Sequence, residues 1–188
     1  MKSDSLLIIL KSTLQKTMTE ELAKVIAESE FSIKELIDLT FHVDEKIGFR
    51  ASWILENVYI RYTAHFWPHA TYFLTRFHHQ QNLSSRRHFG KILALMTAKK
   101  APVYIREVID TYHTEKVVET TFSWLIDEQV PVAVKSHCLN ILANLTSKHQ
   151  WIKNELLATM DFLVDKESIA FYAKAKQIKK QLIATIKQ

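Results

Sequence analysis

Glycine and proline are scarce in this chain, whose 188 residues include two glycines and three prolines. A β-sandwich or a doubly wound sheet needs many tight turns, and tight turns draw on these two residue types. Helices joined by short polar loops need far fewer of them. The scarcity therefore favours an all-α fold over a fold built on a sheet.

Cysteine is scarcer still, since Cys138 is the only one. A single cysteine excludes an internal disulfide and a cysteine-rich metal site, which suits a reducing cytoplasm. The apolar run at the N-terminus, Leu6–Leu10, ends at Lys11 and is shorter than the core of a secretory signal. No apolar run approaches the length of a membrane span. We therefore expect a cytoplasmic protein with no membrane partner.

The charge is modestly positive, with 25 Lys+Arg against 20 Asp+Glu and a formal net charge of +5. This excess permits an anionic partner without demanding one, because it lacks the dense basic blocks of nucleic-acid-binding arms.

Apolar residues recur at helical spacing along nearly the whole chain. This periodicity predicts about 9–11 helices, near residues 4–17, 19–29, 32–42, 45–62, 67–80, 84–98, 103–113, 115–128, 131–147, 149–164 and 168–187. All three prolines fall in the first turn of a predicted helix: Pro68, Pro102 and Pro131. Ser32 with Glu35 has the spacing of a capping box, and Thr19 with Glu21 resembles an acidic helix start. No linker divides residues 1–188, so we predict a single domain.

Four of the predicted helices share one apolar stripe at positions i, i+4, i+7 and i+11. One column of it is isoleucine throughout: Ile54, Ile92, Ile141 and Ile178. The other columns are Ile47, Ser85, Val134 and Phe171; Ala51, Phe89, Cys138 and Ala175; and Val58, Met96, Leu145 and Leu182. The isoleucines are spaced by 38, 49 and 37 residues, and an apolar partner helix precedes each stripe. The repeating unit is thus a two-helix hairpin near the length of HEAT and armadillo repeats.

From about residue 32 to residue 187, the chain resembles the HEAT-like helical repeat superfamily. The segments 50–56 (RASWILE) and 130–135 (VPVAVK) are similar to small bacterial HEAT-like proteins of unknown role, among which the label adenylosuccinate lyase occurs. The resemblance implies a right-handed stack of about four antiparallel hairpins over residues 32–187, with residues 1–31 as capping helices. It also implies a binding surface along the second helices of the hairpins.

Lyase chemistry finds no support in the residues. The catalytic loop of that lyase superfamily resembles Ser-Ser-x-Met-Pro, whereas Ser84 and Ser85 are followed here by Arg86, Arg87 and His88. We therefore rank a small lyase-type enzyme third among the functions and expect no catalytic residues.

Other catalytic and ligand motifs are missing as well. Cys138 falls in the apolar stripe, which predicts a buried, inert thiol. His65 and His69 have a zinc-compatible spacing, but Pro68 lies between them and no glutamate occupies the zincin position. Gly48 and Gly90 are isolated within helices and form no phosphate loop, so we expect neither a metal nor a cofactor.

Polar side chains follow one flank of the apolar stripe. The column just before the Ala51 column is basic or potentially basic in all four helices: Arg50, His88, His137 and Lys174. The predicted binding ridge adds the polar neighbours Trp53, Asn57, Lys91 and Asn144. Any helix needs a polar flank, so an ordinary solvated edge is the competing interpretation. Our leading hypothesis is that the protein is a non-catalytic scaffold that binds a protein or peptide through this ridge.

The densest basic group supports the alternative, a HEAT-like protein that binds nucleic acid. It consists of Arg86, Arg87, Lys91, Lys99 and Lys100, with aromatic residues such as Trp67 and Tyr72 nearby in the sequence. Basic charge together with stacking rings is typical of nucleic-acid binding, although the pattern is not specific.

Overall fold

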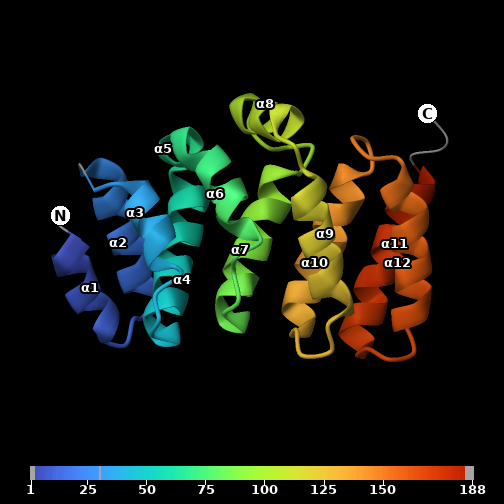
Figure 1. The fold of residues 1–188 in the computed structure, drawn as a ribbon, viewed down its shortest axis with the longest axis horizontal. Helices are drawn as coiled ribbons and strands as arrows, with labels where there is room; N and C mark the ends of the chain where they lie inside the picture. The colour runs from blue at the N-terminus through green and yellow to red at the C-terminus, as the bar shows by residue number, and fades with distance from the viewer. Residues whose placement is uncertain (1–2, 30, 185–188) are drawn as a thin grey trace. The chain divides into compact units, whose positions relative to one another are not determined.

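The computed structural model describes residues 3–29 and 31–184, and within these ranges the chain forms helices and connecting turns with no strand (Figure 1). The all-α prediction is therefore confirmed. The chain divides into two compact units, residues 1–92 (unit 1) and residues 93–188 (unit 2), which are described separately below. The prediction of one domain stays a prediction.

The helices follow one another as predicted hairpins. Unit 1 contains α1 (Ser3–Lys11), α2 (Lys16–Glu28), α3 (Ile33–Leu39), α4 (Glu45–Arg61), α5 (Thr63–Phe66), the 3-10 helix η1 (Trp67–His69), α6 (Ala70–Phe77) and most of α7 (Leu83–Met96). Unit 2 contains the end of α7, then α8 (Val103–Thr111), α9 (Glu115–Ile126), α10 (Val132–Leu145), α11 (Trp151–Leu163) and α12 (Ile169–Ala184). The extra helix predicted over residues 103–113 is α8.

The repeated apolar stripe is the core of both units. Its four columns lie on α4, α7, α10 and α12, and no residue in them is more than 3% exposed. The inert position predicted for Cys138 is consistent with this burial, since the thiol is fully buried. Removal of this apolar surface from water is the main source of stability for such helices.

Each second helix packs against the helix that precedes it. In unit 1, α4 contacts α1, α2 and α3. Helix α7 meets α6 through aromatic rings, with the Phe89 ring 4.9 Å from that of Phe73 and 6.3 Å from that of Phe77. In unit 2, α10 contacts α9, α11 and α12. Of these pairs, α3 with α4, α6 with α7 and α9 with α10 correspond to the predicted hairpins.

The N-terminal helix boundaries were predicted wrongly. Residues 4–17 do not form one helix, because α1 ends at Lys11 and the Ser12 hydroxyl donates to the Ile9 carbonyl. The second helix then begins at Lys16, so Thr19 lies inside α2, where its buried hydroxyl donates to the Lys16 carbonyl. Side-chain bonds to local carbonyls compete with helix continuation, and apolar periodicity does not detect them.

The capping box and the helix predicted over residues 67–80 also need correction. Ser32 stands at the N-cap of α3, but its side chain makes no capping hydrogen bond. The segment around Pro68 is broken into α5, η1 and α6 rather than forming one helix. Pro68 has no N–H to donate, which favours the short 3-10 turn observed there. Pro102 and Pro131 are N-caps, one residue before α8 and α10.

Gly48 permits a close approach within unit 1. A Cβ atom added to Gly48 on α4 would lie 2.9 Å from the Thr40 carbonyl oxygen. That oxygen belongs to the backbone and also accepts a hydrogen bond from the buried Gln80 amide, at 3.3 Å. The connection between α3 and α4 would therefore have to shift to admit a methyl group.

We predict that Gly48→Ala destabilises the protein. The alanine gains up to about 1 kcal/mol of helix propensity. Overpacking against a fixed backbone atom costs about 1–3 kcal/mol, so the net change is expected to be unfavourable. Urea denaturation would measure it, with Lys46→Ala at an exposed position of α4 as the control. A Gly48→Ala variant as stable as the control would contradict the close approach.

Candidate binding surfaces on the second helices

Two predicted ridge residues of unit 1, His88 and Lys91, meet at a carboxylate that the sequence analysis missed. Glu56 lies on α4, and only 8% of it is exposed. Its Oε2 atom is 2.6 Å from Nδ1 of His88, and its Oε1 accepts a 2.6 Å hydrogen bond from Nζ of Lys91. Both partners lie on α7. Glu56 thus links the flanks of the two second helices within this unit.

Aromatic rings cover this cluster. The Trp53 indole stacks on the His88 ring, with centroids 6.4 Å apart and planes 20° apart. The Phe49 ring lies 5.3 Å from the His88 ring and 6.1 Å from the Trp53 ring. Trp53 and Phe49 are each half-buried, so part of each ring faces solvent. Among the described atoms, His88 Nε2 is buried without a hydrogen-bond partner.

Two opposing effects act on the Glu56 carboxylate. Burial raises its pKa, whereas hydrogen bonds and positive charge from His88 and Lys91 lower it. The net result is a pKa below the ordinary glutamate value. The cluster therefore keeps a charged group inside unit 1 by supplying partners for both carboxylate oxygens.

The other predicted ridge residues of unit 1 make internal hydrogen bonds. The Arg50 guanidinium donates to the Leu10 carbonyl at 2.8 Å, joining α4 to the end of α1. Asn57 is buried, and its amide donates to the Trp53 carbonyl at 3.0 Å. Among the ridge residues of this unit, Arg50, Trp53 and Lys91 are partly exposed, and the Arg50 guanidinium is already bonded to α1.

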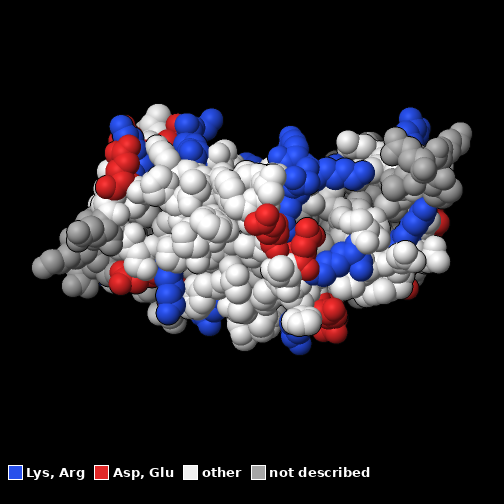
Figure 2. Space-filling model, turned by 90° about the horizontal axis from the view of Figure 1, so that it is seen from above, with Lys and Arg blue, Asp and Glu red and all other residues white. Residues whose placement is uncertain are grey.

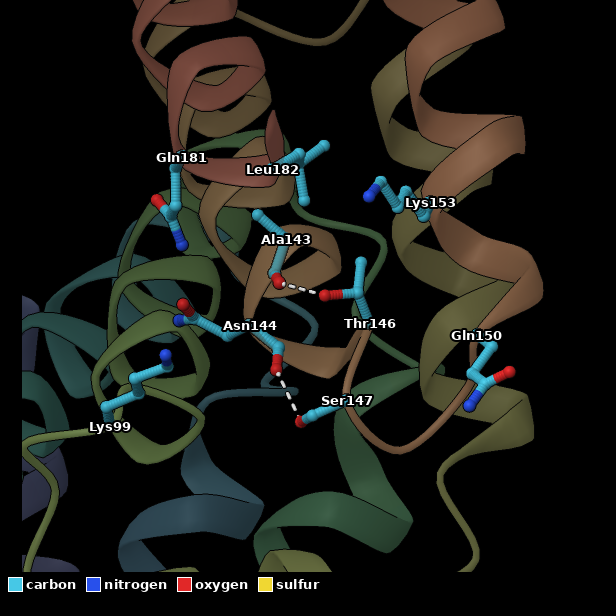
Figure 3. Close-up of a pocket in the computed structure, with 9 residues that line it drawn as sticks. All are labelled: Lys99, Ala143, Asn144, Thr146, Ser147, Gln150, Lys153, Gln181 and Leu182. Carbon is cyan, nitrogen blue, oxygen red and sulfur yellow. Dashed lines mark hydrogen bonds between the residues drawn. The ribbon is translucent and has the colours of Figure 1, made fainter. Parts of the chain in front are cut away.

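Unit 2 contains a polar hollow of about 370 Å³ at the carboxyl ends of α10 and α12 (Figure 3). Its lining consists of Lys99, Ala143, Asn144, Thr146, Ser147, Gln150, Lys153, Gln181 and Leu182. Lys99 and Lys153 approach it from opposite sides in the close-up. None of the lining residues is acidic. Two of the predicted residues, Asn144 and Lys99, are brought together here, whereas Lys153 was not predicted.

The helix carbonyls next to this hollow already have donors. The Thr146 and Ser147 hydroxyls donate to the carbonyls of residues 143 and 144, at 2.8 and 3.4 Å. The Asn144 amide donates to the Ala94 carbonyl and to the Thr97 hydroxyl, at 3.3 and 3.2 Å. Neutral groups thus supply the hydrogen bonds that a helix carboxyl end needs.

Lys148 behaves differently from Lys99 and Lys153. Its ammonium group donates to three carbonyls at the end of α8, those of Ile109, Asp110 and Tyr112, at 2.7, 2.9 and 2.6 Å. A lysine in this position stabilises a helix by capping it and by opposing its dipole. In contrast, neither Lys99 nor Lys153 has an ion-pair or hydrogen-bond partner among the residues that the structure describes.

The remaining predicted residues are dispersed. Arg86 is buried in unit 1, where its guanidinium donates to the Gln80 carbonyl and the Gln81 side chain, so it adds little to a surface patch. Arg87, Lys99 and Lys100 are exposed. In unit 2, His137 is half-buried, and Lys174 donates to the Gln177 side chain, its pKa lowered by burial. Lys and Arg side chains gather around α8 on the face shown in Figure 2.

Buried repeat stripes with polar flanks define the class of helical-repeat scaffolds. A family model described as HEAT repeat domain matches residues 8–182, so the chain belongs to the HEAT repeat domain family. The resemblance stated from the sequence is confirmed, and the match also covers most of the two helices predicted as caps. No curated protein and no solved structure matches the chain.

Two searches of the described ranges bear on other kinds of site. None of the helices there is both long and apolar enough to cross a membrane. Within the same ranges, no group of three or more histidine, cysteine, aspartate or glutamate side chains could hold a metal ion.

We predict that Glu56→Gln lowers the free energy of unfolding by about 1–3 kcal/mol near neutral pH, because the buried His88 and the partly exposed Lys91 lose a charged acceptor. The carboxylate pKa is lower in the folded state, so this stabilisation is complete above the unfolded-state pKa of about 4.3 and is lost as pH falls through the folded-state value.

Urea titrations from neutral to acid pH would test this dependence. The difference between wild type and Glu56→Gln should shrink on acidification, while the exposed control Glu155→Gln should have little effect throughout. A difference that grows below the unfolded-state pKa would show the opposite sign of linkage.

We also predict that Lys148→Met destabilises unit 2 by about 1–2 kcal/mol, because three helix-end carbonyls lose their donor. Amide hydrogen exchange in the last turn of α8 should accelerate. Lys153→Met is the matched control, since Lys153 donates to no carbonyl within residues 3–29 and 31–184. Equal exchange rates in the two variants would argue against a capping role for Lys148.

Proposed function

We propose that this HEAT repeat protein is a non-catalytic scaffold that binds a protein or peptide along the flank of its second helices. HEAT repeats often mediate protein interactions, and stacked hairpins provide extended surfaces for them. The proposed contact residues are those of the predicted ridge: Arg50, Trp53, Asn57, His88, Lys91, His137, Asn144 and Lys174.

The observation that carries this proposal is the supported Trp53 ring. The indole rests on His88, which Glu56 holds, and Lys91 lies beside it with 41% of its side chain exposed. A tryptophan fixed by its neighbours loses little conformational freedom on binding, and such residues dominate the energy of many interfaces. Arg50 would then act mainly by holding α4 against the end of α1.

Nucleic-acid binding is the alternative, and the contacts favour it less. Of its predicted residues, Arg86 is buried and Lys91 is paired with Glu56. This leaves Arg87, Lys99 and Lys100 as the exposed cations of that set. Binding through phosphates would weaken steeply with salt, which provides a direct test with duplex and single-stranded oligonucleotides.

We predict that peptides selected from a random displayed library against the wild-type protein lose affinity at least about tenfold on Trp53→Ala, because an interface tryptophan is often worth about 2 kcal/mol or more. Fluorescence polarisation would measure the loss. Trp53→Phe, which keeps a ring on His88, should retain part of the affinity, and circular dichroism would verify that each variant folds.

Trp151→Ala is the matched control. Trp151 is also exposed, but it lies on the first helix α11, where it stacks on Phe122. Equal losses in the Trp53 and Trp151 variants would refute the proposed face. So would oligonucleotide binding that is tighter than any peptide and depends on Arg87 and Lys100.

A further inference from the structure

We infer that the polar hollow of unit 2 binds the carboxylate side chains of an acidic peptide segment. This inference rests on the proposed function, since it names the chemistry of one part of the partner. Its basis is the lining, in which Lys99 and Lys153 approach a shared space from opposite sides (Figure 3).

The two lysines are not required to cap helices. A lysine near a helix carboxyl end is ordinarily explained by the carbonyls there, as Lys148 illustrates on α8. Around the hollow, however, hydroxyl and amide groups from Thr146, Ser147 and Asn144 take that role. At the end of α10 these bonds are made without the lysines, and neither ammonium group has a partner among the described residues, so both are open to an external acceptor.

Charge decides what that acceptor is. The carboxyl ends of α10 and α12 each carry a partial negative charge of about half an elementary charge, and the amino end of α11, where Gln150 is the N-cap, carries a partial positive charge of similar size. Two full positive charges outweigh these ends, and none of the lining residues is acidic. An anionic group is therefore favoured, and both lysines should contribute to its binding.

The extent of the site favours a peptide over nucleic acid. A second hollow of about 310 Å³ adjoins the first and shares Lys99, Asn144 and Ser147 with it. Arg106 and Lys148 add positive charge there, against Asp110. Neither hollow has an aromatic residue in its lining, so neither offers the stacking surface that single-stranded nucleic acid uses. An extended chain with spaced carboxylates suits two adjoining polar hollows.

The test is a fluorescence-polarisation titration of the full chain with a labelled ten-residue peptide of alternating glutamate and glycine. The wild-type protein should bind it, and Lys99→Gln with Lys153→Gln should weaken binding at least about tenfold, with each single change giving several-fold. A peptide with glutamine in place of glutamate should bind far more weakly. The matched control removes two exposed charges from α12, by Lys176→Gln with Lys180→Gln, and should change affinity little.

Several results would overturn the inference. These are no binding of the acidic peptide, equal loss in the two double variants, or displacement of the peptide by micromolar inorganic phosphate. Tighter binding of an oligothymidine that depends on Lys99 and Lys153 would assign the hollow to nucleic acid. If library peptides still bind through Trp53 when the acidic peptide does not, this inference alone fails. If neither binds, the proposed function fails with it.

Discussion

Burial of one apolar stripe fixes the orientation of every second helix. Ile54 and Ile92 in unit 1, and Ile141 and Ile178 in unit 2, are at most 1% exposed. Once this stripe faces the core, the geometry of the helix fixes the direction of its other faces. The positions just beside the stripe come close to the neighbouring helix, while the carboxyl end must find donors for its last carbonyls. Both candidate surfaces follow from these two consequences.

The flank beside the stripe is less exposed to solvent than an ordinary polar helix edge. His88 and Asn57 occupy flank columns, yet less than a tenth of each is exposed. At that depth a polar group must have a partner, which Glu56 provides to His88 and the Trp53 carbonyl to Asn57. The same contacts that satisfy buried groups also support the Trp53 ring. The packing of this unit and the exposure of part of the Trp53 ring thus depend on the same contacts.

Most of the core was predicted from the sequence, because the residue types at repeated positions show how the repeats align. Aligned isoleucines with apolar neighbours at fixed offsets identify the buried columns without knowledge of the fold. Glu56 was not predicted, although it is adjacent to Asn57 in the sequence. Its partners come from α7, and a pairing between helices leaves no spacing signal within either one. Only the coincidence of an acid on one flank with His88 and Lys91 on the next could have suggested it.

Helix breaks were the other failure, and they have a local cause. Periodicity continues through residues 12–15 and 63–69, where Ser12 and Pro68 end hydrogen-bonding patterns that apolar spacing does not report.

Local hydrogen bonds also distinguish the lysines of unit 2, which look alike in the sequence. Lys148 donates hydrogen bonds to three carbonyls at the end of α8. Around the hollow, hydroxyl and amide groups donate to the nearby carbonyls in place of Lys99 and Lys153. A basic residue near a helix end indicates a ligand only after the carbonyls there have been assigned to other donors. At the ends of α8 and α10 that assignment can be made bond by bond. The assignment identifies Lys99 and Lys153, among the many basic residues, as the pair proposed to contact an acidic partner.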